Sequence, residues 1–303
     1  MKLNLEKIIA KILTLLSVLP LSILQGLGLF FGFILSFFPT QITKIAERNV
    51  ELCYPELSIL QKRKLVRKIV IQTVISGAEM PALFLKDSKK ILNQIKEVKG
   101  LDKLKKAYLK EQGLICIGPH VGCWELGGLF LADHFPLFTL YTPPKQPFLD
   151  EIITKGRSRS GAEMAQASQS GVRRLFKALK DNKALALLTD QVPNANDFGG
   201  LYAPFFGIDA WTMNFPSKLY EKRKAPVFIV YAIRLGVGRG FKVIVEDFLP
   251  FIEKYQKISD CPDPFTYAMN DCYEAIARKY PSQYQWSYRR FKHPPKNHPG
   301  FYD

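Results

Sequence analysis

The stretch LICIGPHVGCWE, residues 114–125, is the most informative part of the sequence. Its first five residues form an uninterrupted apolar run, which is typical of a strand buried on both faces of a sheet. Gly118 and Gly122 suit a sharp turn after that strand, because glycine allows tight backbone conformations. His120 falls in the turn and Glu125 in the first turns of a following helix. We therefore expect the two side chains to meet at the end of a buried strand.

His120 and Glu125 form a candidate catalytic pair. A neutral imidazole can take the proton of a hydroxyl group while the oxygen attacks a thioester, and a carboxylate would fix the ring tautomer and stabilise the imidazolium. This chemistry needs no serine or cysteine nucleophile. A lone histidine after a strand is more often structural, so the assignment depends on accompanying motifs. No G-x-S-x-G stretch occurs, which disfavours a serine hydrolase.

The rest of the chain alternates short apolar runs with helical patterns. This alternation predicts an α/β fold with a mainly parallel mixed sheet flanked by helices, and ligands near the carboxyl ends of the strands. The expected strands are 114–118, 137–141, 184–189, 226–233 and 242–245. The expected helices are 57–86, 147–159, 171–182, 213–224 and 264–280.

An apolar segment precedes this region. No charged residue occurs between Ile12 and Thr43, and residues 12–38 are long enough to cross a bilayer as one helix. Pro20 and the glycines Gly26 and Gly28 would alternatively split the segment into two shorter helices that lie in or re-enter the membrane. Its length and the lack of a cleavage pattern disfavour a signal peptide. We expect a membrane anchor over residues 1–43 and a catalytic domain over residues 44–303.

The chain is strongly basic. Its 43 Lys and Arg against 27 Asp and Glu give a net charge of +16, which favours anionic partners such as phospholipid head groups or an acidic carrier protein. The helix expected over residues 57–86 carries many of these cations, either as a solvated face or as a contact with an anionic membrane surface. The five cysteines and four histidines lack metal-site spacing, so we expect reduced thiols and metal-free chemistry.

Several motifs, in order and spacing, are similar to those of one family. The His-x-x-x-x-Glu pattern of residues 119–125 resembles that of the late acyltransferases of lipid A biosynthesis, the lauroyl/myristoyl acyltransferase family. The other stretches are YTPPKQPFLD (141–150), GRSRS (156–160), TDQ (189–191), PFFG (204–207), AWT (210–212) and WSYRRFK (286–292). Thr142 and Gln146 depart from the Arg and Asn often found at those positions. The resemblance covers essentially the whole chain.

The resemblance implies a fold like that of glycerolipid acyltransferases and an O-acyltransferase activity. The donor would be acyl-acyl carrier protein, or acyl-CoA in some members, and the acceptor a hydroxyacyl chain of a Kdo-lipid A precursor. The reaction would take place at the cytoplasmic face of a bacterial inner membrane. No cofactor would be needed beyond the phosphopantetheine that carries the donor chain, and no nucleic-acid partner is expected.

The resemblance also implies substrate-binding residues. Arg157 and Arg159 would hold acceptor phosphates or the donor's phosphopantetheine, since a guanidinium suits phosphate. Asp190 lies at the carboxyl end of a strand, where it would bind substrate or only cap a turn. Arg289 and Arg290 are expected in a patch for the membrane or the carrier protein.

The aromatic motif and the overall function each leave alternatives. Phe205, Phe206 and Trp211 would either line an acyl channel or belong to the core, which is the commoner place for aromatic clusters. One rival function is a related acyltransferase that acts on a phosphoinositol mannoside or another glycolipid. The other is a non-catalytic, membrane-tethered nucleic-acid binder, which lacks any recognisable binding motif and would leave His120 and Glu125 unexplained.

Overall fold

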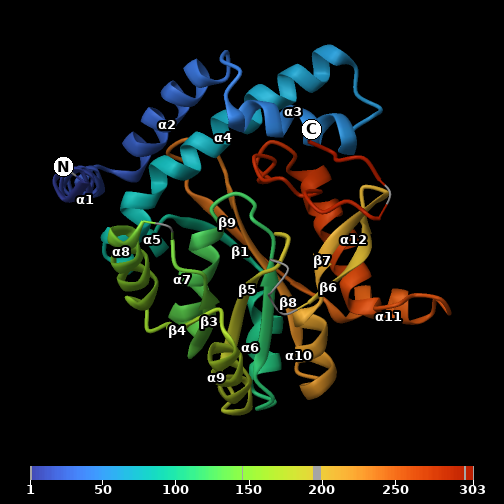
Figure 1. The fold of residues 1–303 in the computed structure, drawn as a ribbon. Coiled ribbons are helices and arrows are strands. Elements are labelled where there is room, and N and C mark those ends of the chain that lie inside the picture. Colours follow the sequence, from blue (N-terminus) through green and yellow to red (C-terminus); the bar gives the residue numbers. More distant parts are fainter. Residues whose placement is uncertain (1, 145, 194–198, 297, 303) are drawn as a thin grey trace.

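The computed structural model describes residues 2–144, 146–193, 199–296 and 298–302, with the side chains of residues 2–5 left out. Its centre is a seven-stranded sheet in the order β1-β9-β8-β2-β5-β3-β4, with helices on both faces (Figure 1). The strands are β1 (Ile95–Lys99), β2 (Leu114–Gly118), β3 (Leu137–Tyr141), β4 (Glu163–Gln166), β5 (Ala184–Leu188), β8 (Val227–Arg234) and β9 (Phe241–Asp247). A separate hairpin consists of β6 (Gly200–Phe205) and β7 (Ile208–Met213).

The sheet is mixed but mostly parallel, which confirms the predicted fold class. β2 lies between β5 and β8 and is parallel to both, and only the β8–β9 pair is antiparallel. All five predicted strands are present within one or two residues of their expected limits. β1, β4 and the hairpin were not predicted. β1 reads IKEVK and is mostly exposed, so it lacks the apolar run that identified the buried strands.

The helices agree with the sequence pattern where that pattern was clear. Those predicted are α4 (Ile59–Leu85), α8 (Pro147–Ser158), α9 (Gln169–Lys180), α10 (Phe215–Arg223) and α12 (Pro264–Lys279). α7 (Trp124–His134) begins at the expected place, one residue before Glu125. The remaining helices are α1 (Lys2–Val18), α2 (Leu21–Leu35), α3 (Gln41–Cys53), α5 (Ser88–Leu92), α6 (Leu101–Tyr108) and α11 (Leu249–Gln256).

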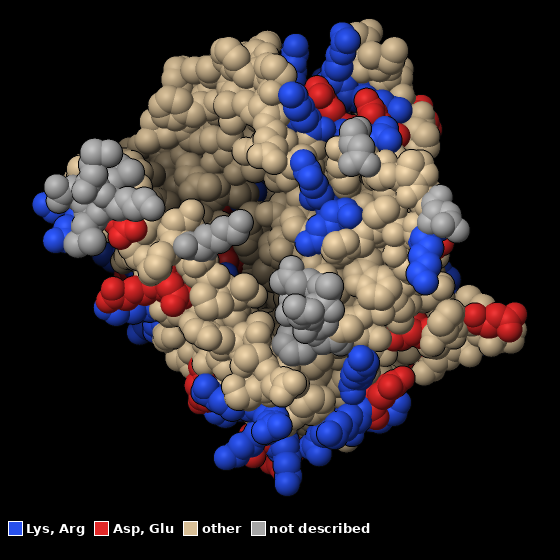
Figure 2. Space-filling view, in the orientation of Figure 1, with Lys and Arg blue, Asp and Glu red and all other residues tan. Residues whose placement is uncertain are grey.

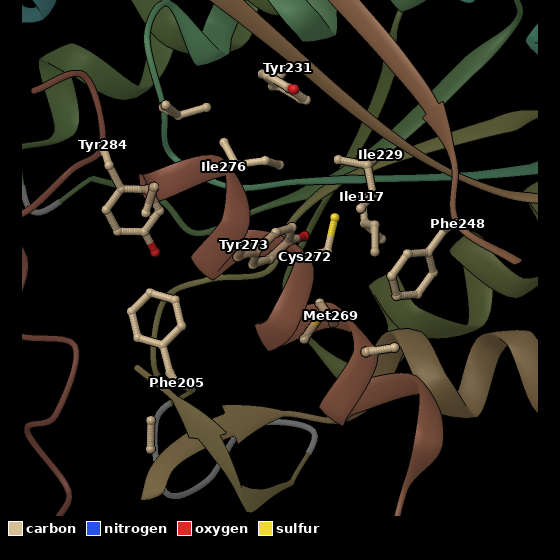
Figure 3. Packing of buried hydrophobic residues seen from close by; sticks show 14 of the residues in the cluster. Ile117, Phe205, Ile229, Tyr231, Phe248, Met269, Cys272, Tyr273, Ile276 and Tyr284 are labelled. Carbon is tan, nitrogen blue, oxygen red and sulfur yellow. The ribbon is translucent and has the colours of Figure 1, made fainter. Parts of the chain in front are cut away.

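Alternate residues of the central strands supply two separate cores. Ile115 and Ile117 of β2 face the core on the side of α9, α10 and α12, whereas Leu114 and Cys116 face the core on the side of α6 and α7. Figure 3 shows the first of these cores, where side chains of the sheet meet α12 residues such as Cys272. With apolar contacts on both faces, β2 and its neighbours form a rigid support for the loops at their carboxyl ends.

The apolar N-terminal segment is broken at Pro20. α1 and α2 meet at a bend of 119°, so residues 12–38 do not form one straight helix, and the alternative of two shorter helices is confirmed. By length and composition, α4 is the one described single helix that could cross a membrane, and half of its most apolar window is buried inside the protein; α1 and α2 pass the same test only if the bent pair is taken as one span.

α2 packs closely along α4. Cβ atoms added at Gly28 and Gly32 would lie 2.7 Å from the Cα of Ile75 and 2.8 Å from the Cα of Ile71. Two small residues four positions apart therefore let the two backbones approach, as in many helix pairs with small contact residues. These glycines serve helix packing, whereas the sequence suggested Gly26 and Gly28 as points of helix breakage.

A buried polar cluster also joins α2 to the body of the protein. Glu79 of α4 accepts hydrogen bonds from Arg234 at 2.7 and 2.5 Å and from Gln25 of α2 at 2.7 Å. The side-chain oxygen of Gln25 accepts a hydrogen bond from the backbone amide of Gly238 at 2.8 Å. Glu79 and Arg234 are almost fully buried, and a buried charge is tolerated when it is paired and hydrogen-bonded. The cluster fixes α2 against α4 and the β8–β9 connection.

Candidate active site

His120 meets Asp190 because the two residues follow neighbouring parallel strands. β2 and β5 pair in register from Leu114 opposite Ala184 to Gly118 opposite Leu188. His120 lies two residues past the end of β2, and Asp190 lies two residues past the end of β5. The sheet therefore delivers an imidazole and a carboxylate to the same point at its carboxyl edge.

The contact between His120 and Asp190 is direct. The ring Nδ1 of His120 lies 2.6 Å from one Asp190 oxygen, and the His120 backbone amide donates to the other oxygen at 2.9 Å. A carboxylate only accepts hydrogen bonds, so this pairing places the proton of a neutral ring on Nδ1. Nε2 then carries the lone pair, 3.4 Å from the side-chain nitrogen of Gln191. In this tautomer Nε2 is the ring nitrogen that can accept a proton, in place of its long contact with the Gln191 amide.

Asp190 is buried and stays ionised. Burial on its own raises the pKa of a carboxyl group, but the attraction of His120 and the hydrogen bonds from its ring and amide lower the pKa of Asp190 below its ordinary value. The charge of Arg290 adds a smaller lowering effect. Asp190 is therefore a fixed negative charge that would stabilise an imidazolium at His120.

Two glycines hold the His120 turn close to β8. Gly122 has φ +58°, and a Cβ there would lie 2.1 Å from the carbonyl oxygen of Ala232. A Cβ at Gly118 would lie 2.4 Å from the carbonyl oxygen of Val230. The amide of Cys123 donates to the Ala232 carbonyl at 2.8 Å. Residues with side chains would push the turn away from β8, so the glycines position His120.

Glu125 has a different partner from the one that the sequence suggested. It binds Arg157 of α8 through two hydrogen bonds, of 2.9 Å to Nε and 2.5 Å to Nη2. Asp190, and not Glu125, contacts Nδ1 of the His120 ring, so the expectation that Glu125 orients this ring does not hold in the structure; a catalytic role for Glu125 stays a prediction. The spacing of five residues does bring Glu125 into the same site, since His120 and Glu125 line the same cavities.

The other predicted binding residues lie at or near the site with distinct contacts. Arg157 is held by Glu125 and is partly exposed. Arg159 donates to the backbone carbonyl of Leu83 at 2.6 Å, which ties α8 to α4. Arg289 is exposed and lies over the ring of Tyr302. Phosphate binding by Arg157 and Arg159 stays a prediction.

Arg290 and the aromatic motif belong to the interior. Arg290 is 3% exposed and donates to the Trp211 carbonyl and to Thr212, so it cannot form part of a surface patch as expected. Its guanidinium instead ties the hairpin to the C-terminal segment. Phe205 and Phe206 are buried in the core, which confirms the core alternative for them, while Trp211 is partly buried and packs on Tyr202.

Two cavities meet at His120. The first, which we call the strand cavity, has a volume of about 310 Å³ and runs beside α7 along the last residues of β2, β3 and β5. The second, which we call the helix cavity, has a volume of about 340 Å³ and lies between α1, α4 and α8. Both are lined by His120, Trp124, Glu125 and Arg157. Figure 2 shows a hollow with tan walls beside the N-terminal helices.

Sequence reasoning missed several groups around the site. Gln191 donates to Gln285 at 3.0 Å, which places both amides next to His120. Glu79 and Arg234 lie behind the His120 turn, where they line a small crevice with Gly122 and Cys123. Glu79 and Arg234 are each the lone charge in an otherwise apolar segment of the sequence. Because buried charges are normally paired, this pattern could have indicated that the two residues bind each other. Within the described ranges, no group of three or more His, Cys, Asp or Glu could hold a metal ion.

The fold and the site together define a class of protein: a mostly parallel α/β fold with a histidine–carboxylate pair at the carboxyl edge of its sheet, beside two cavities. The chain belongs to the family described as bacterial lipid A biosynthesis acyltransferase, whose family model matches residues 4–293. It is therefore an acyltransferase.

Curated relatives agree over nearly the full length. The chain is 29% identical over 289 residues to a lipid A biosynthesis palmitoleoyltransferase of Escherichia coli K12, which covers 94% of this chain and 90% of the relative. It is 25% identical over 301 residues to a lipid A biosynthesis lauroyltransferase of the same organism, covering 96% and 92%. A lipid A biosynthesis acyltransferase of Haemophilus influenzae is 29% identical over 301 residues, covering 94% and 89%.

Proposed function

We propose that this acyltransferase moves a fatty acyl chain from acyl-acyl carrier protein to a hydroxyl of a hydroxyacyl chain on a Kdo-lipid A precursor. The observation that carries the proposal is the His120–Asp190 pair, whose histidine lines two cavities large enough for apolar chains. The membership of the family supports the lipid acceptor. The donor chain arrives on phosphopantetheine, and the protein's own residues supply the acid–base chemistry.

The reaction is a single acyl transfer with His120 as base and acid. Nε2 takes the proton of the acceptor hydroxyl while its oxygen attacks the thioester carbonyl carbon. The carbon–sulfur bond then breaks, and the imidazolium returns the proton to the departing thiolate, so the products are an ester and a free thiol. Asp190 stabilises the imidazolium between these two steps, because its charge and its 2.6 Å contact with Nδ1 are already in place.

The N-terminal helices support attachment to the inner membrane, with the catalytic domain on its cytoplasmic face. Most large apolar side chains of α1 and α2 that do not face α4 are exposed, among them Leu15, Val18, Phe30, Phe31 and Phe33. Contiguous exposed apolar surface of this kind marks contact with lipid or protein. Residues 1–43 then form the anchor, and residues 44–303 form the catalytic domain.

The basic residues nearby support contact with anionic lipid. Arg63, Lys64, Arg67 and Lys68 are exposed on the first half of α4, beside the apolar end of α2. Figure 2 shows Lys and Arg side chains gathered at the top of the molecule, over the region of α3 and the start of α4. Cations next to an apolar surface strengthen binding to a membrane with anionic head groups.

The proposal is tested with the full-length enzyme in detergent. Acyl carrier protein loaded with C10 to C16 chains serves as donor, and mass spectrometry of the lipid identifies the product. We expect a Kdo-lipid A precursor to gain one acyl chain, and His120→Ala to lower kcat by about 10²–10⁴-fold. Transfer to a phosphoinositol mannoside but not to the Kdo-lipid A precursor would overturn the proposed acceptor. Unchanged turnover in a folded His120→Ala variant would overturn the proposed base.

A further inference from the structure

The helix cavity touches the same histidine as the strand cavity. Eight of its wall residues are aliphatic or aromatic hydrocarbons or thioethers: one from α1 (Leu13), four from the last turns of α4 (Met80, Pro81, Phe84 and Leu85) and three from α8 (Leu149, Ile152 and Ile153). Its polar groups are His120, Glu125, Arg157 and Gln285, apart from the indole of Trp124. An occupant that fits is a long apolar chain with one polar group at its reactive point.

The strand cavity fits the donor better than the acceptor. Its walls include the ends of three strands that are fixed by sheet hydrogen bonds, such as Cys116 and Ala186. Thr139, Thr142 and Gln191 add polar groups to it. A cavity with rigid walls selects for the length of its occupant, because interiors close-packed like these resist an extra methylene. The acyl chain of the donor is the substrate whose length such a cavity would measure.

The helix cavity is bordered by the part of the protein that is most apolar on its outside. Leu13 lies in its wall, while Ile12 and Leu15, its neighbours on α1, are 49% and 72% exposed. A lipid held in a bilayer could therefore bring one chain into this cavity without crossing water. A donor delivered by a water-soluble carrier has no such need. Figure 1 shows α1, α4 and α8 on the same side of the molecule, and Figure 2 shows the hollow among them.

From this geometry we propose that the helix cavity binds the hydroxyacyl chain of the lipid acceptor and presents its hydroxyl to Nε2 of His120, while the strand cavity holds the donor chain. The assignment rests on the proposed function. It gives each reacting chain its own cavity and makes His120 the point where the two chains meet. Binding two chains in fixed positions is an effective way to accelerate a bimolecular transfer.

A matched pair of variants tests the assignment in the full-length enzyme. Ile152→Trp adds bulk to the helix cavity alone, and Gly128→Leu adds bulk to the strand cavity alone, where a Cβ would meet nothing within 4 Å. Both are assayed in detergent with C10 to C16 acyl carrier protein and the Kdo-lipid A precursor. We expect Ile152→Trp to raise KM for the acceptor by about tenfold or more and to keep the wild-type order of donor lengths. Gly128→Leu should shift that order toward shorter donors.

The possible outcomes separate the assignment from the function on which it rests. A change of donor order in Ile152→Trp, or a wild-type KM for the acceptor, would overturn the assignment while leaving the acyltransferase function intact. A wild-type enzyme that moved no acyl chain to any lipid would overturn the function first. If Ile152→Trp unfolds at a lower temperature than the wild type, Leu149→Trp, on the same wall of the cavity, replaces it in the test. Transfer to an acceptor with a shortened hydroxyacyl chain gives an independent check, since KM for it should rise in the wild type.

Discussion

The carboxyl edge of the sheet and the N-terminal helices build their functions in opposite ways. At the sheet edge, paired strands and two glycines fix His120 against Asp190, and each contact is a hydrogen bond of defined geometry. In α2, two glycines and one glutamine hold the inner side to α4, while the outer side is a broad apolar surface whose large side chains are mostly exposed. The function of the sheet edge depends on the positions of single atoms, whereas that of the N-terminal helices depends on the area of their exposed apolar surface. Substitutions should therefore have steep effects in the first region and graded effects in the second.

The largest effect is expected at Asp190. In Asp190→Asn, the amide nitrogen can donate to Nδ1 and move the ring proton to Nε2, so His120 would lose its basic nitrogen. We expect kcat to fall by about 10²–10⁴-fold, as for loss of the base itself. The double variant with His120→Ala should be little worse than His120→Ala alone, because the carboxylate acts through the ring. Steady-state kinetics on variants with wild-type thermal unfolding measure this, and effects that multiply fully would contradict the pairing.

A smaller effect is expected for Glu125→Gln. This change keeps the shape of the side chain but weakens its two hydrogen bonds to Arg157, which lines both cavities. Charge-assisted bonds of this kind contribute about 1.5–3 kcal/mol, so we expect kcat/KM to fall by about 10- to 100-fold. Here the effects of Glu125→Gln and His120→Ala should multiply, in contrast to Asp190. If the double variant Glu125→Gln with His120→Ala were little worse than His120→Ala alone, as expected for Asp190→Asn, Glu125 would also act through His120.

The outer surface of α2 should respond gradually. Phe30 and Phe31 are each 58% exposed, so replacing both by Ser changes the apolar area without touching the packing on α4. We expect binding to vesicles with anionic lipid to weaken by about tenfold or more, since each side chain buries apolar area in the bilayer. Vesicle sedimentation measures the change. Undiminished binding of the double variant in high salt would show that this surface does not enter the membrane.

The inner side of α2 offers a comparison within one helix. Gly28→Ala places a methyl group 2.7 Å from the backbone of Ile75, whereas Gly26→Ala meets nothing within 4 Å. We expect Gly28→Ala to lower the free energy of unfolding by about 1–3 kcal/mol through overpacking. Gly26→Ala should raise it by about 0.5–1 kcal/mol, because alanine favours the helix. Denaturant unfolding in detergent checks the two signs, and equal effects would contradict the close approach of α2 to α4.

The smallest change is expected in the pH dependence of stability. In the folded protein the pKa of Asp190 lies below the ordinary value that it has in the unfolded chain. The interactions of the Asp190 carboxylate therefore stabilise the folded state fully when the pH is above the ordinary pKa, and this stabilisation is lost as the pH falls through the folded-state pKa. The difference in unfolding free energy between wild type and Asp190→Asn should therefore be constant near neutral pH and shrink in acid. In a His120→Ala background the shrinkage should be weaker, because His120 is the main favourable charge. A difference that grew in acid would contradict this sign.

The sequence was enough to locate the site, but it did not show that His120 pairs with Asp190. Apolar runs of β2 and β5 predicted buried strands, and the motifs containing His120, Glu125 and Asp190 indicated their shared involvement. The strand order was not readable, because periodicity does not tell which parallel strands are neighbours. Once β2 and β5 are known to pair in register, Asp190 follows as the partner of His120, since each lies two residues past the end of its strand.

Other predictions failed for reasons that depend on burial. Arg290 lies in a basic stretch whose sequence is typical of a surface patch. Its side chain instead points inward and donates hydrogen bonds to Thr212 and Asn270. The pattern of the segment could not distinguish it from the exposed Arg289 next to it. The buried Glu79 and Arg234 were likewise visible only as isolated charges, and their pairing needs the packing of α4 on β8.

An enzyme that handles thioesters risks acylating its own thiols, since thiolates attack them readily. Cys116 lies in the wall of the strand cavity, next to the proposed path of the donor chain. Burial raises the pKa of its thiol to about 12, so the thiol form is strongly favoured at neutral pH. Burial also keeps the pKa of Cys123, three residues after His120, well above its ordinary value. The apolar packing that holds β2 in place thereby also disfavours the thiolate of Cys116, the form that would attack a thioester.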